Sequence, residues 1–114
     1  MTKGLRKNIR MEVFSGPNQQ TLMTNYTVNI SIGGVYLETD TISPVDSLLV
    51  MKFKIPGNNP IISCNARVAW TNEAGQRKKA DLPPGMGIQF LNLSLEKLNF
   101  IRNFLKGGDL EPDW

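Results

Sequence analysis

The feature that most constrains the fold is an alternation of apolar and polar residues that recurs along most of the chain. It is clearest over residues 62–70, where Ile62, Val68 and Trp70 share one parity and Arg67 has the other. A period of two is typical of β-strands with one buried face. The pattern predicts six strands, over residues 11–14, 22–30, 35–38, 49–55, 62–70 and 86–90.

Turn-forming residues separate these strands. Gly33-Gly34, the proline- and glycine-containing run over residues 56–60, and the run over residues 83–85 each interrupt the alternation. Glycine and proline favour turns because they supply backbone angles that other residues adopt less easily. Short strands at this spacing favour an antiparallel barrel or a sandwich. We favour a barrel because closure leaves no exposed sheet edge.

The spacing of apolar residues changes near the C-terminus. It becomes three or four residues over 95–106, which predicts a helix there. Ser94 suits the N-cap of this helix, and Gly107-Gly108 suits its end. The apolar stripe consists of Leu95, Leu98, Ile101 and Leu105. We expect the stripe to pack against the barrel, and a partner-binding helix is the alternative.

These patterns predict one all-β domain with a helix at its end. The domain covers residues 11–106, preceded by a flexible basic arm over residues 1–10 and followed by a tail over residues 107–114. Trp114, in the tail, is expected to pack back on the domain or to touch a partner.

The composition removes several classes of function. The 114 residues contain no histidine and one cysteine, Cys64. The chain therefore lacks the commonest general base and the usual metal ligands, so neither an enzyme nor a metal site is predicted. The single thiol excludes an internal disulfide, and no apolar run approaches the roughly 20 residues that span a bilayer. We expect a cytoplasmic protein without membrane insertion.

Two clusters of basic residues are either solvated surface or anion sites. In the first, Arg6 and Arg10 lie four residues apart, just before the first predicted strand. Guanidinium groups bind phosphate oxygens bidentately, match the O6 and N7 acceptors of guanine and stack on its face. The second cluster is Arg77-Lys78-Lys79.

A polar motif begins at Asn29. Asn29 and Ser31 share the polar parity of their strand, so both side chains point away from Ile30 and can hydrogen-bond a purine edge. Gly33 and Gly34 follow, and they allow a tight turn and a close approach of the backbone. The alternative is an ordinary hairpin turn with polar flanks.

Several other residues have two interpretations. Trp70 falls on the apolar parity and is expected in the core, with a base-stacking platform as the alternative. Cys64 also falls on the apolar parity and is expected in the core, and Tyr26 shares the apolar parity of its own strand. Arg67 falls on the outward parity, where a solvated side chain is favoured over a ligand contact. Tyr36 is the main aromatic residue with outward parity.

The two motifs together resemble the two-part signature of the PilZ family, bacterial receptors for the second messenger cyclic di-GMP. They are Arg6-x-x-x-Arg10 and Asn29-x-Ser31-x-x-Gly34. The later run over residues 85–90 resembles the closing strand of the family, so the resemblance extends over residues 5–105. It implies an all-β fold, a six-stranded antiparallel β-barrel with one C-terminal α-helix.

The resemblance also implies a set of ligand-binding residues. Two arginines would grip phosphates and guanine faces, an amide and a hydroxyl would hydrogen-bond a guanine, and the glycines would leave room for the ligand. The implied residues are Arg6, Arg10, Asn29, Ser31, Gly33 and Gly34. No cofactor is expected beyond the ligand, cyclic di-GMP itself.

The function that follows is a receptor whose basic arm becomes ordered when cyclic di-GMP binds, with a downstream protein partner reading the changed surface. The family suggests motility, adhesion or matrix production as the process. The alternative is an adaptor of the same fold that does not bind the nucleotide. Nucleic-acid binding is not expected, because outward aromatic residues are few and the net charge is only +3.

Overall fold

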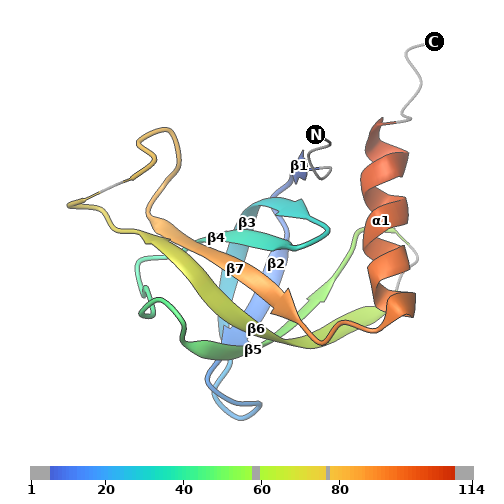
Figure 1. The fold of residues 1–114 in the computed structure, drawn as a ribbon, viewed down its shortest axis with the longest axis horizontal. Coiled ribbons are helices and arrows are strands. Elements are labelled where there is room, and N and C mark those ends of the chain that lie inside the picture. The colour runs from blue at the N-terminus through green and yellow to red at the C-terminus, as the bar shows by residue number, and fades with distance from the viewer. Residues whose placement is uncertain (1–5, 58–59, 77, 110–114) are drawn as a thin grey trace.

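The computed structural model describes residues 6–57, 60–76 and 78–109, with the backbone alone for the last three. Figure 1 shows a β-barrel with one helix beside it. The strands are β1 (Arg6–Asn8), β2 (Glu12–Gly16), β3 (Met23–Ser31), β4 (Gly34–Glu38), β5 (Leu48–Lys54), β6 (Ile61–Asn72) and β7 (Gly85–Leu91), and the helix is α1 (Leu95–Asp109).

The barrel consists of six antiparallel strands. Along the sheet the order is β1-β3-β2-β5-β6-β7-β4, and β4 also pairs with β3, so strands β2 to β7 form a closed ring. Closure gives both edges of these strands a hydrogen-bonded neighbour over much of their length. The all-β, six-stranded barrel with a C-terminal helix that the sequence predicts is therefore confirmed, and β1 is an addition to it.

Apolar side chains from all six barrel strands fill the interior. Val13, Ile30, Leu37, Phe53, Val68 and Ile88 represent the six strands in this core. The helix adds Ile101 and Leu105, which are buried in the same cluster. The predicted packing against the barrel is thus confirmed for Ile101 and Leu105, whereas Leu98 is only partly buried and Leu95 at the helix start is exposed.

The helix begins where the sequence predicts and ends later. Ser94 Oγ accepts a hydrogen bond from the Lys97 backbone N–H at 3.2 Å, the geometry of an N-cap. At the other end the helix continues through Gly107 and Gly108 to Asp109, beyond the predicted end at residue 106. Glycine disfavours a helix by only about 1 kcal/mol, so it does not oblige the helix to stop. No helix within the described ranges is both long and apolar enough to cross a membrane.

Two irregularities in the ladders change which side chains face outward. The register shifts between Thr27 and Asn29 in β3, and again between Val68 and Trp70 in β6. An extra residue in one strand reverses the facing of the residues on one side of it. Tyr26 has the apolar parity of its strand in the sequence, yet the residue is 38% exposed. Trp70 is also turned outward and is only partly buried.

The short strand β1 continues the line of β2 along the same edge of β3. Thr27 bridges the break between them: its hydroxyl accepts a hydrogen bond from the Met11 N–H at 3.0 Å and donates one to the Ile9 carbonyl at 2.5 Å. Residues 6–8 of the predicted arm are thus paired in the sheet in this structure. The flexibility predicted for the arm stays a prediction.

Candidate functional site

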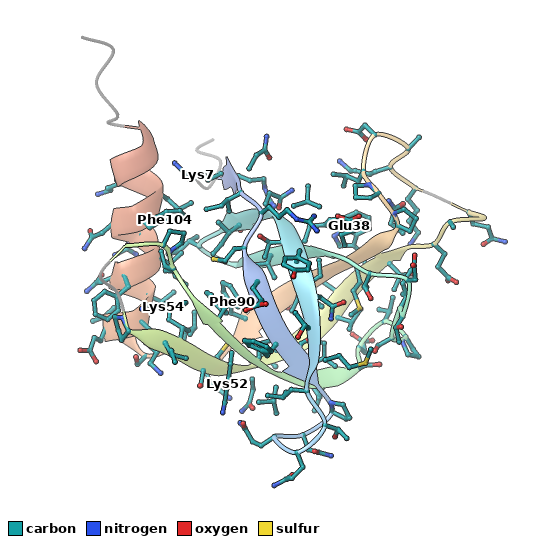
Figure 2. All side chains as sticks on the ribbon, turned by 180° about the vertical axis from the view of Figure 1, so that it is seen from behind. Lys7, Glu38, Lys52, Lys54, Phe90 and Phe104 are labelled. Carbon is teal, nitrogen blue, oxygen red and sulfur yellow. The ribbon has the colours of Figure 1, made fainter. Side chains whose placement is uncertain are left out.

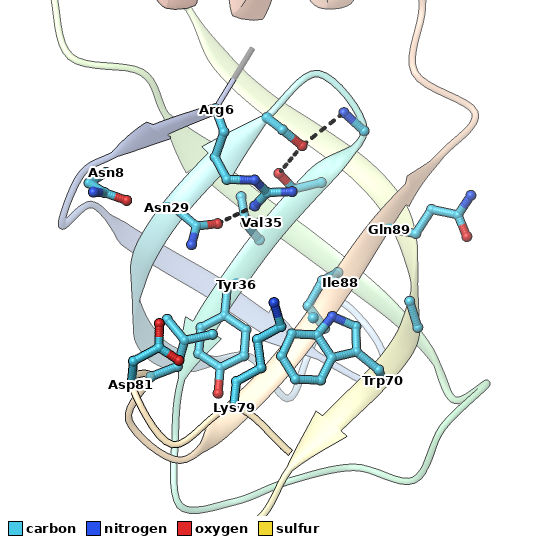
Figure 3. Close-up of a pocket in the computed structure, with 16 residues that line it drawn as sticks. Arg6, Asn8, Asn29, Val35, Tyr36, Trp70, Lys79, Asp81, Ile88 and Gln89 are labelled. Carbon is cyan, nitrogen blue, oxygen red and sulfur yellow. Dashed lines mark hydrogen bonds between the residues drawn. The ribbon is translucent and has the colours of Figure 1, made fainter. Parts of the chain in front are cut away.

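A pocket of about 680 Å³ opens on the outer face of the barrel. Its lining comes from β1, β3, β4, β6, β7 and the loop between β6 and β7 (Figure 3). Ligand pockets in proteins commonly have volumes of roughly 300–1,000 Å³, so this one is large enough for a nucleotide-sized molecule.

Five of the six predicted ligand-binding residues line this pocket. They are Arg6, Asn29, Ser31, Gly33 and Gly34. The pairing of β1 with β3 places Arg6 opposite Ser31 and within reach of Asn29. The Arg6 guanidinium donates a hydrogen bond to Asn29 Oδ1 at 2.5 Å, so the first arginine and the amide of the motif form one unit (Figure 3).

Ser31 organises the turn that follows it. Its hydroxyl accepts a hydrogen bond from the Gly33 N–H at 3.3 Å and donates one to the Gly34 carbonyl at 3.4 Å. These long hydrogen bonds are weak, because the usual distance is roughly 2.7–3.2 Å. Ser31 lines the pocket, and its hydroxyl is held only loosely by its own turn.

Gly34 is required by the neighbouring strand. A Cβ atom at this position would lie 1.8 Å from the carbonyl oxygen of Ile88 in β7, whereas a Cβ at Gly33 would have no heavy atom within 4 Å. The close approach of β4 to β7 explains the glycine at position 34 without any ligand. Room for a ligand at this position stays a prediction.

The pocket contains an aromatic pair that is not among the six predicted ligand-binding residues. The Tyr36 and Trp70 rings are stacked with their centroids 5.3 Å apart and an interplanar angle of 29°. Trp70 lies directly against Gly87, where a Cβ would come within 2.0 Å of the indole nitrogen. A glycine inside a strand signals a close approach of this kind, so Gly87 is the sequence signal that marks the place. Tyr36 lies on the pocket side of its strand, as its outward parity predicts, but the residue is only 2% exposed.

The charges in the pocket are mixed. Arg6 and Lys79 contribute cations, and Asp81 contributes a carboxylate. Arg67, which the sequence placed on the outward parity, does not line the pocket and instead forms an ion pair with Asp46 and hydrogen bonds with Gln89.

Arg10 is the predicted site residue that the structure leaves outside the pocket. Its guanidinium lies 3.2 Å from a Glu38 carboxylate oxygen and 4.3 Å from the centroid of the Tyr26 ring. Tyr26 and Glu38 face each other across the β3–β4 ladder, so together they form a platform for the arginine. The two arginines of the motif therefore have different surroundings.

Cys64 packs against the core, as predicted from its parity. Burial raises the pKa of its thiol to about 11, and the nearby Lys97 ammonium partly opposes this rise. A thiol with such a raised pKa is a poor nucleophile at neutral pH. Within the ranges that the structure describes, no three histidine, cysteine or acidic side chains gather as metal ligands do.

The fold and the site define a class of protein: a small antiparallel β-barrel, with a C-terminal helix and an open pocket next to an arginine-bearing N-terminal strand. The family model of the PilZ domain matches residues 5–107. The chain belongs to the PilZ domain family. None of the curated proteins matches the sequence.

Solved structures share the fold at low sequence identity. The Bacillus subtilis inhibitor of motility, MotI/DgrA, has a TM-score of 0.79 and 16% identity over 100% of this chain and 54% of its own. The PilZ domain of CeSA from a cellulose-synthesizing bacterium has a TM-score of 0.58 and 12% identity, covering 91% and 97%. MrkH of K. pneumonia, solved as a complex with c-di-GMP, has a TM-score of 0.68 and 17% identity, covering 97% and 52%. This chain thus spans about half the length of MotI/DgrA and of MrkH.

Proposed function

We propose that this chain is a receptor for cyclic di-GMP. The observation that carries the proposal is the unit of Arg6 and Asn29, joined by a hydrogen bond at the edge of a pocket that also contains Ser31. Membership of the PilZ family supports it, and so does the structural similarity to MrkH, which was solved with this nucleotide.

The pocket offers what each part of the ligand needs. Cyclic di-GMP carries two phosphates and two guanines. The planar guanidinium of Arg6 suits a phosphate, to which it can donate two parallel hydrogen bonds. The Asn29 amide and the Ser31 hydroxyl can donate to and accept from a guanine edge. The partly exposed ring of Trp70, which stacks on the buried Tyr36, provides an apolar surface for a base, a contact worth roughly 1–3 kcal/mol per stacked base.

The second arginine of the motif would join the ligand by changing partners. Arg10 forms an ion pair with Glu38 and a cation–π contact with Tyr26 in the present structure. Both contacts are exposed, and exposed ion pairs contribute only about 0–1 kcal/mol. A ligand phosphate therefore competes with Glu38 for Arg10 at a small cost.

Binding would stabilise β1 and the surface around it. This strand has three residues, and short edge strands open at low free energy. Arg6 and Lys7 are neighbours in β1 that make different contacts: Arg6 lines the pocket, and the Lys7 ammonium lies 5.2 Å from the centroid of the Phe104 ring in α1 (Figure 2). Ligand contacts to Arg6 would hold β1 in the sheet, and with it the contact to the helix. This is an order–disorder switch whose output a protein partner would read.

We propose a regulatory binding protein of the cytoplasm, with no catalytic step. The chain contains no histidine, and burial keeps the Cys64 thiol protonated at neutral pH. The ligand is the nucleotide itself, and no further cofactor is part of the proposal.

One observation favours the alternative of an adaptor. A second hollow, of about 340 Å³, lies between β2, β5 and β6 and is lined by the exposed side chains of Phe14 and Ile61 with Lys52 and Lys54. Lys52 and Lys54 appear in Figure 2. Exposed aromatic and aliphatic side chains of this kind are typical of protein contacts. An adaptor would use this surface and leave the first pocket empty.

Isothermal titration with cyclic di-GMP tests the proposed function. We expect saturable binding by the wild-type chain and a loss of at least about tenfold in affinity for Arg6→Ala, because a charge-assisted hydrogen bond contributes roughly 1.5–3 kcal/mol. Arg102→Ala is the matched control, since Arg102 lies on the exposed face of α1 and contacts Asn99. Equal affinity of the two variants, or no binding by the wild type, would contradict the proposal.

A further inference from the structure

Of the basic run Arg77-Lys78-Lys79, the described residue Lys79 lines the pocket. Arg77 lies outside the described residues. Lys78 and Lys79 are both exposed, but only Lys79 of the two lines the pocket. Figure 3 shows the Lys79 side chain directed into the pocket, near the rings of Tyr36 and Trp70. Neighbouring lysines on the same loop thus have different surroundings.

A buried amide fixes the backbone of Lys79. Asn72, at the end of β6, is fully buried. Its Oδ1 accepts a hydrogen bond from the Lys79 N–H at 3.0 Å, and its Nδ2 donates one to the Lys79 carbonyl at 3.0 Å. One side chain therefore satisfies both backbone groups of this residue. A buried amide with its hydrogen bonds made is rigid, because breaking them leaves polar groups without partners.

The far end of the loop is tied to the same barrel wall. The Tyr36 hydroxyl donates a hydrogen bond to the Pro83 carbonyl at 2.6 Å and accepts one from Asn72 Nδ2 at 3.2 Å. The Leu82 N–H donates to the Lys79 carbonyl at 3.2 Å and closes a turn between them. The position of Lys79 is therefore set by residues of the barrel itself.

Lys79 contributes one of the positive charges of the pocket. The described residues of the pocket lining carry two cations, Arg6 and Lys79, and one carboxylate, Asp81, a net charge of +1. Arg10 lies outside the pocket and forms an ion pair with Glu38. Among the described residues Lys79 takes part in no ion pair. Without Lys79 the described part of the lining would have no net positive charge for a ligand with two phosphates.

We propose that Lys79 is a second cationic contact for the ligand, binding a phosphate of cyclic di-GMP, and that Asn72 is the residue that positions it. This inference rests on the proposed function and adds a residue outside the two-part arginine and asparagine motif. The ammonium group acts as a compact charge with three donors, which suits a phosphate oxygen.

Titration of cyclic di-GMP into Lys79→Gln and Lys78→Gln tests the proposal. Both variants remove one charge from the same loop. We expect the dissociation constant to rise about tenfold or more for Lys79→Gln and less than about twofold for Lys78→Gln. The affinity of Lys79→Gln should also depend less on salt, because one screened attraction to the ligand is gone. Equal dissociation constants for the two variants would overturn the proposal.

The positioning role has its own readout. Asn72→Asp keeps the shape of the side chain but replaces the donor that faces the Lys79 carbonyl. We expect it to weaken binding in the wild-type background and to have little further effect in Lys79→Gln, a non-additive pair. Additive losses of binding free energy would contradict the positioning role of Asn72. If Asn72→Asp does not fold, the comparison of Lys79→Gln with Lys78→Gln still tests whether Lys79 contacts the ligand.

The outcomes separate this inference from the proposed function. If the wild type binds, Arg6→Ala weakens binding and Lys79→Gln does not, only the proposed role of Lys79 is contradicted. A wild-type chain that does not bind cyclic di-GMP overturns both.

Discussion

Arg10 lies 3.2 Å from a Glu38 carboxylate oxygen, in an ion pair outside the pocket that Arg6 lines. The two arginines of the motif thus make different contacts. Arg6 lines the pocket and donates a hydrogen bond to Asn29, and Arg10 forms an ion pair with Glu38 of strand β4. Glu38 and a ligand phosphate are competitors for the same guanidinium.

Removing this competitor should tighten binding. We expect Glu38→Gln to lower the dissociation constant for cyclic di-GMP about two- to fivefold, the scale of an exposed ion pair. Calorimetric titration measures it, with Glu96→Gln as a control that removes an acid in the first turn of α1. Weaker binding by Glu38→Gln than by Glu96→Gln would show that Glu38 serves the bound state instead.

The adjacent glycines Gly33 and Gly34 should respond very differently to alanine. A Cβ at Gly34 would collide with the Ile88 carbonyl, and one at Gly33 meets open space. We expect Gly34→Ala to lower the free energy of unfolding by about 1–3 kcal/mol, and Gly33→Ala by no more than about 0.5 kcal/mol. Urea denaturation of both variants measures this. Similar values would mean that β4 and β7 separate without cost.

Much of the fold follows from the sequence, and the exceptions have physical causes. The alternation predicts all six barrel strands because each directs apolar side chains at every second position into the core. The alternation gives Tyr26 and Trp70 the wrong facing because their strands, β3 and β6, each contain a register shift. The hydrogen bonds that position such a shift involve a neighbouring strand. The three residues of β1 are too few for a periodic signal.

Only the part of the site that a local sequence motif carries could be predicted. Arg6, Asn29 and Ser31 carry a local motif, and the β1–β3 ladder brings them to one pocket. The position of Lys79 depends on Asn72 and on the Tyr36 hydroxyl, which lie seven residues away or more along the chain. Such long-range hydrogen bonds leave no local pattern, so the run of basic residues alone was ambiguous.

The Thr27 hydroxyl should stabilise the junction between β1 and β2. Thr27→Val keeps the shape but removes the acceptor of the Met11 N–H and the donor to the Ile9 carbonyl. We expect a loss of about 1–3 kcal/mol in the free energy of unfolding and faster hydrogen exchange at the Met11 amide. Thr24→Val, at an exposed position of the same strand, is the control and should change little. Equal stability of the two variants would contradict the bridging role.

The Cys64 thiol should react slowly in the folded protein. Burial raises its pKa from the ordinary value of 9.0 to about 11. A difference of this size lowers the thiolate fraction about a hundredfold at pH 8, so alkylation by iodoacetamide should be slower by a similar factor than in urea. Because the folded pKa lies above the unfolded one, the corresponding contribution to stability is complete below pH 9.0 and is lost as the pH rises towards about 11. Equal alkylation rates in the two states would exclude this burial.

The most direct test of the central claim is the location of the nucleotide by NMR. Cyclic di-GMP is titrated into the ¹⁵N-labelled chain, and the shifts of the backbone amides and of the Trp70 indole N–H are followed. We expect the largest changes at Arg6, at residues 29–34 and at Trp70, all around the pocket. Absence of shifts at saturating nucleotide, or shifts confined to the hollow around Phe14 and Ile61, would contradict the account.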